Sequence, residues 1–101
     1  MNQKERLHIK EKLKETLSKE KEVSKIIVFG SFLKSKKPND IDVAVFQNTQ
    51  DKYLNLSLKY RKLTRDIARI IPLDIIPIKE NSNGVFLKEI NYGEVIYERR
   101  S

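Results

Sequence analysis

Three aspartates occupy positions where an unpaired carboxylate is unfavourable, and their spacing indicates that they act together. Asp40 and Asp42 are two residues apart in a stretch that predicts a strand, so both side chains point to one face. Asp74 lies inside another apolar strand, between Leu73 and Ile75. Like charges this close repel one another unless a cation neutralises them. Because oxygen ligands suit divalent cations, the pattern favours a metal site.

A glycine and a serine follow the first predicted strand, a short distance before the aspartates. Gly30 would let backbone N–H groups approach a phosphate, and the Ser31 hydroxyl would add a donor. Together with the three carboxylates, this turn predicts metal-assisted phosphoryl chemistry. Each feature alone has a structural explanation, since a Lys or Arg opposite each carboxylate would also neutralise it, and a DxD pair arises by chance in many strands.

The combination resembles a known signature. Gly30-Ser31 followed by Asn39 to Val43 (NDIDV) is similar to the GS…DxD motif of the DNA polymerase beta-like nucleotidyltransferase superfamily. The small freestanding form of this fold, the minimal nucleotidyltransferase (MNT) domain, is a particularly good match. The resemblance covers most of the chain, from a leading helix to a strand that carries the third aspartate, and the ending at residues 86–97 is also similar.

The resemblance implies a role for each residue of the motif. Asp40 and Asp42 match the pair that binds both of two Mg²⁺ ions, with Mn²⁺ as an alternative. Asp74 matches the carboxylate that completes one metal site and helps to activate the attacking hydroxyl. Gly30 and Ser31 match the turn that holds the triphosphate. The implied reaction is in-line attack on the α-phosphorus with pyrophosphate leaving.

The loop after the Gly-Ser turn departs from the family pattern. Family members often read GSxARG, whereas Phe32 to Ser35 (FLKS) contains neither the arginine nor the second glycine. Positive charge for the phosphates would come from Lys34, Lys36 or Lys37. We assign Lys34 to nucleotide binding, as a mobile point charge rather than a bidentate fork.

Three functions follow from these observations. By the resemblance, the chain is a magnesium-dependent nucleotidyltransferase that transfers AMP from ATP to a hydroxyl. The acceptor would be a tyrosine of a HEPN-type partner toxin, with this chain as the antitoxin of a toxin–antitoxin system. The second function is an MNT-fold module that neutralises a partner protein without turnover. The third is RNA binding by a basic helix surface formed by Arg61, Arg65 and Arg69.

The apolar pattern predicts the elements that position these residues. We expect a helix over residues 2–22 and strands over 24–29, 40–46, 73–78 and 94–97. A loop or one helical turn should occupy 32–37, a long helix should run from 49 or 51 to 70, and a turn at 81–84 should precede a short helix over 85–91. Pro77 indicates that its strand lies at an edge or ends there. This order predicts an α/β (α+β) domain with a small mixed sheet and helices packed mainly on one face.

Periodicity predicts which helical residues face the core. In the first helix these are Ile9, Leu13 and Leu17, and in the long helix they are Tyr53, Leu56, Tyr60, Leu63, Ile67 and Ile70. Leu54 and Leu58 fall outside this stripe and indicate a second apolar face, for a partner or a homodimer. The lone His8 lies among charged residues and is expected at the surface.

Composition limits the remaining choices. The 101 residues allow a single domain, 1–101, and the absence of cysteine excludes disulfide scaffolds and thiol catalysis. The charged first 15 residues lack a signal-peptide core, and the chain has no apolar run of membrane-spanning length, so a cytoplasmic protein is expected. The net charge of +7 suits nucleotide phosphates, nucleic acid or an acidic partner, and equally a solvated Lys/Glu-rich surface.

Overall fold

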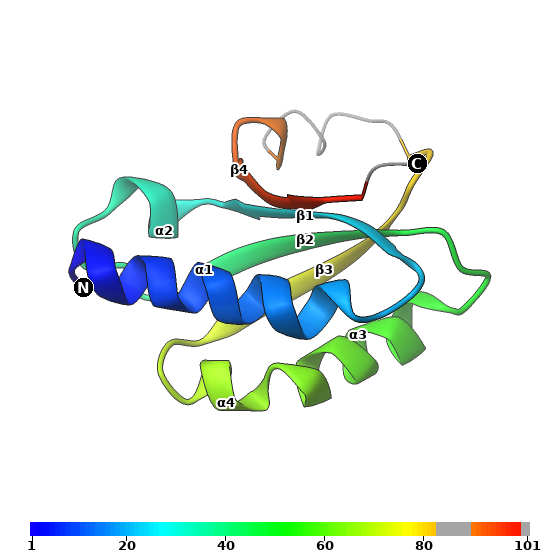
Figure 1. Ribbon diagram of the computed structural model, residues 1–101, viewed down its shortest axis with the longest axis horizontal. Coiled ribbons are helices and arrows are strands. Elements are labelled where there is room, and N and C mark those ends of the chain that lie inside the picture. The colour runs from blue at the N-terminus through cyan, green and yellow to red at the C-terminus, as the bar shows by residue number, and fades with distance from the viewer. Residues whose placement is uncertain (83–89, 100–101) are drawn as a thin grey trace.

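The predicted strands form one mixed sheet, with the helices α1, α3 and α4 on one of its faces (Figure 1). The computed structural model describes residues 1–82 and 90–99. The sheet has four strands in the order β3-β2-β1-β4. The elements are α1 (Gln3–Ser18), β1 (Val23–Phe29), α2 (Ser31–Lys34), β2 (Ile41–Gln47), α3 (Tyr53–Leu63), α4 (Arg65–Ala68), β3 (Leu73–Lys79) and β4 (Glu94–Glu98). The predicted fold class is confirmed.

Helix α1 begins at a capping box. The Asn2 side chain accepts a hydrogen bond from the Glu5 backbone, and the Glu5 carboxylate accepts one from the Asn2 backbone, which satisfies two of the unpaired N–H groups at this end. The helix ends at Ser18, four residues before the predicted end at 22. In the turn that follows, Glu20 and Glu22 both pair with Lys59 of α3, at 2.8 and 2.9 Å. These two ion pairs hold the turn before β1 against α3.

The strand directions follow from the connections. Strand β1 is antiparallel to both β2 and β4, whereas β2 and β3 are parallel. Parallel neighbours need a crossover, which α3 and α4 supply on the face that α1 also covers (Figure 1). Strand β3 lies at an edge of the sheet, which is the edge position predicted for Pro77.

Apolar side chains alternate across the sheet and build two clusters. The larger lies between the sheet and the helices and includes the predicted Ile9, Leu13 and Leu17. The smaller covers the opposite face and consists of Ile27, Phe29, Ala44, Phe46, Ile78 and Ile90. This second face of the sheet is therefore also partly covered by apolar side chains. The polar side chains at the end of the sheet lie beside them.

The predicted long helix is in fact two helices. Thr64 separates α3 from α4, and its buried hydroxyl donates to the Tyr60 carbonyl at 2.8 Å, a contact that bends helices. The start is also later than predicted. The backbone N–H of Thr49 donates to Gln47 Oε1, and that of Asp51 donates to Thr49 Oγ1, so these local bonds hold the segment before Tyr53 out of the helix.

This break changes which residues reach the core. Leu56, Tyr60 and Ile67 are buried as predicted. The prediction for the other three was wrong, because Tyr53, Leu63 and Ile70 are 58%, 41% and 58% exposed. They lie at the beginning of α3, at its end and after α4, where the 3.6-residue period of one continuous helix does not apply.

The last part of the chain is described in part. Strand β4 confirms the predicted strand and extends it by one residue to Glu98. Of the predicted turn at 81–84 and helix at 85–91, residues 83–89 lie outside the described residues, while Ile90 and Asn91 are helical. No helix within residues 1–82 and 90–99 is both long and apolar enough to span a membrane.

Tyr60 provides a test of how the larger cluster is packed. Its side chain is fully buried, and within the described residues its hydroxyl has no hydrogen-bond partner. Burial, assisted by the nearby Glu22, raises the pKa of Tyr60 above its usual range. A buried hydroxyl without a partner destabilises the fold. We therefore expect Tyr60→Phe to match the unmodified protein in stability or exceed it by up to about 1 kcal/mol.

Urea unfolding followed by circular dichroism measures this difference. Leu56→Ala in the same cluster is the control for lost packing and should lower the free energy of unfolding by about 2 to 5 kcal/mol. A loss of more than about 1 kcal/mol in Tyr60→Phe would contradict the prediction, because it would mean that the hydroxyl is hydrogen-bonded in solution.

Candidate active site

The pairing of β2 with β3 brings two of the predicted carboxylates together. Asp42 is the direct cross-strand partner of Asp74 in the parallel register, and on its other side it is paired with Phe29 of β1. Residues paired in this way point to the same face of a sheet. Asp42 and Asp74 therefore lie on the face of the smaller apolar cluster, away from α1 and α3.

Asp40 lies one residue before β2, at the same end of the sheet. The backbone N–H of Ile41 donates to the Pro72 carbonyl at 2.9 Å, which holds the beginnings of β2 and β3 side by side. Asp40 and Asp74 are exposed, whereas Asp42 is half-buried between its two neighbouring strands. We call Asp40, Asp42 and Asp74 the carboxylate cluster.

Asp42 is affected both by burial and by the charges of the other two carboxylates. Burial raises the pKa of Asp42, and the charges of Asp40 and Asp74 raise it further. None of the ion pairs within the described residues involves a member of the cluster. The alternative in which a Lys or Arg neutralises these aspartates is therefore not what this part of the chain contains.

Gly30 is required by the carboxylate beside it. It has φ +82°, a conformation that side chains disfavour, and a Cβ added there would lie 2.3 Å from Asp42 Oδ2. The sequence suggested that Gly30 makes room for a phosphate. The geometry adds a second reason, because any larger residue would push the Asp42 carboxylate out of its place.

Ser31 and Lys34 are the first and last residues of α2, the predicted single helical turn. The Ser31 hydroxyl donates to Asp40 Oδ1 at 3.4 Å, so the Gly-Ser turn and the carboxylate cluster are in contact. Lys34 is exposed at the other end of α2. The structure thus gathers Gly30, Ser31 and the cluster at one end of the sheet and leaves Lys34 one turn away.

One residue that supports this region has no sequence signal. Arg6 of α1 donates hydrogen bonds to the carbonyls of Phe32 and Ser35, and so contacts α2 from the helical side of the sheet. In the sequence Arg6 is one of many charged residues in a helix, and its partners are far along the chain. Only the packing of α1 against α2 could reveal it.

The donor chemistry of the cluster fits a hard divalent cation. All three side chains offer carboxylate oxygens, the ligands that Mg²⁺ and Mn²⁺ prefer. A cation would also relieve the repulsion that raises the pKa of Asp42. In the conformation described for residues 1–82 and 90–99, no three His, Cys, Asp or Glu side chains converge closely enough to hold an ion. Binding would therefore require the carboxylates to turn toward a common point.

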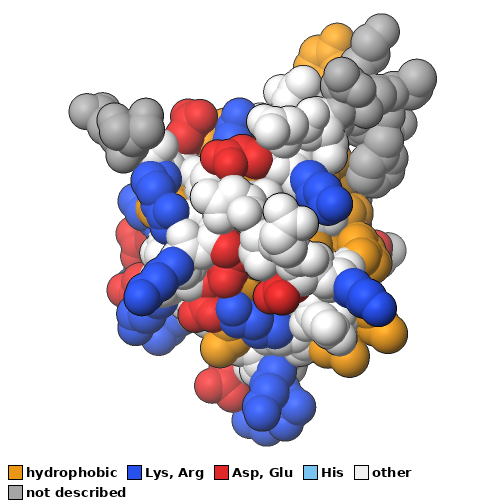
Figure 2. Space-filling model, turned by 90° about the vertical axis from the view of Figure 1, so that its right-hand side faces the viewer, with side chains coloured by type: hydrophobic (Ala, Val, Ile, Leu, Met, Phe, Trp, Pro, Cys, Tyr) orange, Lys and Arg blue, Asp and Glu red, His pale blue; other side chains and the backbone are white. Residues whose placement is uncertain are grey.

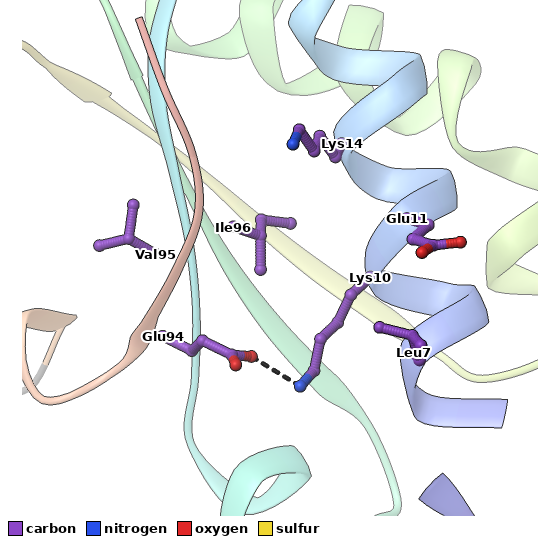
Figure 3. A pocket seen from close by; sticks show the side chains of 7 residues that line it. All are labelled: Leu7, Lys10, Glu11, Lys14, Glu94, Val95 and Ile96. Carbon is purple, nitrogen blue, oxygen red and sulfur yellow. Dashed lines mark ion pairs between the residues drawn. The ribbon is translucent and has the colours of Figure 1, made fainter. Parts of the chain in front are cut away.

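Other surface features lie apart from this cluster. A groove of about 220 Å³ runs between α1 and β4 and is bridged by the ion pair of Lys10 and Glu94 at 2.6 Å (Figure 3). It contains none of the predicted site residues. At the end of the molecule opposite α2, acidic and basic side chains lie side by side (Figure 2).

The remaining predicted surface residues are where the sequence placed them. His8 is exposed, and so are Leu54 and Leu58, at 65% and 58%. The basic residues of α3 and α4 are also exposed, namely Arg61, Lys62, Arg65 and Arg69.

Comparison with solved structures shows the same fold in toxin–antitoxin complexes. One match is a chain from a complex, that of the tri-AMPylated Shewanella oneidensis HEPN toxin with an MNT antitoxin. The TM-score is 0.64 and the identity 19%, and the match covers 93% of this chain and 73% of that one. Chains of two mutants of the MntA-HpeT toxin–antitoxin match at a TM-score of 0.55, with 16% and 17% identity, covering 99% of this chain and 75% of theirs.

At the level of sequence, a family model matches most of the chain. No curated protein matches the chain significantly. The family model described as "Polymerase beta, Nucleotidyltransferase" matches residues 11–101, which include the Gly-Ser turn and the whole carboxylate cluster. The chain therefore belongs to the polymerase beta nucleotidyltransferase family.

Proposed function

We propose that the protein is a magnesium-dependent nucleotidyltransferase that transfers AMP from ATP to a hydroxyl group. The observation that carries this proposal is the register that sets Asp42 beside Asp74. Gly30 lies against the Asp42 carboxylate, and Ser31 contacts Asp40. The Gly-Ser turn and the carboxylates are thus adjacent, which supports a role for the turn in holding the phosphates and for the carboxylates in holding the metal of a metal-bound triphosphate.

Each side chain has a distinct task in this proposal. Asp40 and Asp42 hold the metal ions, and Asp74 completes one metal site and orients the acceptor hydroxyl. Bound Mg²⁺ would neutralise charge on the phosphates and on the two apical oxygens of the in-line displacement. Ser31 would donate its one hydroxyl proton to the triphosphate in place of Asp40, and Lys34 would add a positive charge from the end of α2. Because Asp74 lies on the edge strand β3, the acceptor can approach from that side.

We infer that the acceptor is a tyrosine of a HEPN-type partner and that the protein acts as a cytoplasmic antitoxin. Support comes from the fold, which recurs in the complex of a tri-AMPylated HEPN toxin with an MNT antitoxin and in the MntA-HpeT toxin–antitoxin. The exposed Leu54 and Leu58 of α3 offer an apolar contact for a partner.

A second candidate function is binding without turnover. It is favoured by the lysine-rich loop, where exposed Lys34 stands in place of a bidentate arginine, and by carboxylates that do not converge in the described conformation. In that case the protein would neutralise its partner by contact alone.

The transferase is tested with α-labelled ATP, Mg²⁺ and a co-purified HEPN-type partner. We expect label on the partner, and we expect Asp42→Asn and Asp74→Asn each to reduce transfer by at least about 100-fold, because both change metal ligands. Asp66→Asn is the matched control, since Asp66 is 95% exposed on α4, which covers the face of the sheet opposite to the cluster (Figure 1). It should keep full transfer.

The same variants separate the two candidate functions. A partner that is neutralised equally by the unmodified protein and by Asp42→Asn, without label in either case, would contradict the transferase and support binding without turnover.

The raised pKa of Asp42 predicts a stability effect that does not depend on activity. Without metal, ionised Asp42 destabilises the fold, so Asp42→Asn should be more stable than the unmodified protein at pH 7. Since the pKa is higher in the folded state, this advantage should shrink as the pH falls through the folded pKa. It should vanish below the unfolded value of 3.8.

Thermal unfolding with and without Mg²⁺ measures this dependence. Mg²⁺ should stabilise the unmodified protein and the Asp66→Asn control, and should have little effect on Asp42→Asn. An Asp42→Asn variant that is less stable than the unmodified protein at pH 7 without metal would contradict the description of the cluster as an uncompensated group of charges.

A further inference from the structure

Arg6 of α1 binds the short helix that follows the Gly-Ser turn. Its Nη1 donates a hydrogen bond to the carbonyl of Phe32, and its Nη2 donates one to the carbonyl of Ser35. One guanidinium therefore contacts α2 both within the helix and at Ser35, the residue that caps its end. The Arg6 side chain is half-buried, so these contacts are partly shielded from water.

The two carbonyls that Arg6 contacts need such a partner. The last carbonyls of a helix have no N–H donor within it, and in a helix of one turn this applies to nearly all of them. The Leu33 and Ser35 N–H groups bond to Gly30 and Ser31 at the start of the turn, at 3.2 and 2.8 Å. Arg6 supplies donors to the other end.

The guanidinium of Arg6 also packs over the ring of Phe32. The group lies 5.4 Å from the centre of the Phe32 ring, and Phe32 is fully buried in the larger apolar cluster. A planar cation with several donors can stack on a ring and bind two carbonyls at once, whereas a lysine cannot. The contact therefore depends on arginine rather than on positive charge alone.

The position of α2 sets the position of two proposed nucleotide ligands. Ser31 begins the helix and Lys34 ends it, and the Ser31 hydroxyl contacts Asp40. A single helical turn is not stable by itself in water, so its orientation depends on contacts with the rest of the fold. Arg6 and the buried Phe32 provide those contacts from the helical side of the sheet.

We propose that Arg6 is a positioning residue for nucleotide binding, which holds α2 so that Ser31 and Lys34 meet the triphosphate. This inference rests on the proposed function, because it concerns the same nucleotide site. Arg6 does not contact the nucleotide in this proposal, and its Nη1 and Nη2 bind the carbonyls of Phe32 and Ser35.

The affinity for ATP in the presence of Mg²⁺, measured by calorimetry, tests the proposal. Arg6→Lys keeps the charge and loses the fork, and Arg6→Met loses both. We expect both variants to bind ATP roughly 10- to 100-fold more weakly, with a matching rise in KM. The matched control is Arg61→Lys, an exposed position on α3, which should leave the affinity unchanged.

Hydrogen exchange of the Ser35 amide reports on α2 directly and needs no activity. This N–H donates to the Ser31 carbonyl at 2.8 Å, so it should exchange faster in Arg6→Lys than in Arg61→Lys. If Arg6→Lys binds ATP as tightly as the control, the proposal is overturned, even when the amide exchanges faster, because Arg6 would then be only a structural contact.

The failures of the two proposals are distinguishable. If the protein binds ATP but transfers no nucleotide, the transferase reaction is contradicted. The comparison of Arg6→Lys with Arg61→Lys then still tests the positioning role of Arg6. A loss of affinity in Arg6→Met that Arg6→Lys restores completely would also overturn the positioning role, because it would show that only the charge matters. Absence of ATP binding by the unmodified protein would overturn both.

Discussion

The parallel pairing of β2 with β3 is the constraint on which the rest of the site depends. It sets Asp42 directly beside Asp74 and leaves two carboxylates on one face with no ion pair among the described residues. A parallel pair requires a crossover connection, and α3 and α4 provide it between β2 and β3. The arrangement is unfavourable for the protein alone, and a bound cation would relieve the repulsion between the two carboxylates.

The neighbouring strand β1 leads into the turn to which we assign the phosphates. Strand β1 ends at Phe29, which pairs with Asp42, so the chain must turn beside the carboxylate. Gly30 is the residue that allows this turn without displacing Asp42. Helix α2 then continues from the turn and contacts Asp40 through Ser31. The Gly-Ser turn and the carboxylate cluster are thus in direct contact.

Much of this could be predicted from the sequence, because local patterns determine it. The period of two places Asp40 and Asp42 on one face, and the Gly-Ser pair marks the end of β1. The break at Thr64 could not be predicted, since it depends on a hydroxyl that bonds to the backbone of Tyr60 in the folded helix. The contact of Arg6 with α2 joins residues 26 and 29 positions apart and needs the tertiary structure.

The central claim is that the carboxylate cluster and the Gly-Ser turn together bind a metal–nucleotide complex. A crystal structure with Mn²⁺ and a non-hydrolysable ATP analogue tests it most directly, because the anomalous scattering of manganese locates the ion. We expect an anomalous peak between the carboxylates of Asp40, Asp42 and Asp74, with the triphosphate at Gly30 and Ser31. A nucleotide bound elsewhere, with no manganese at the cluster, would contradict it.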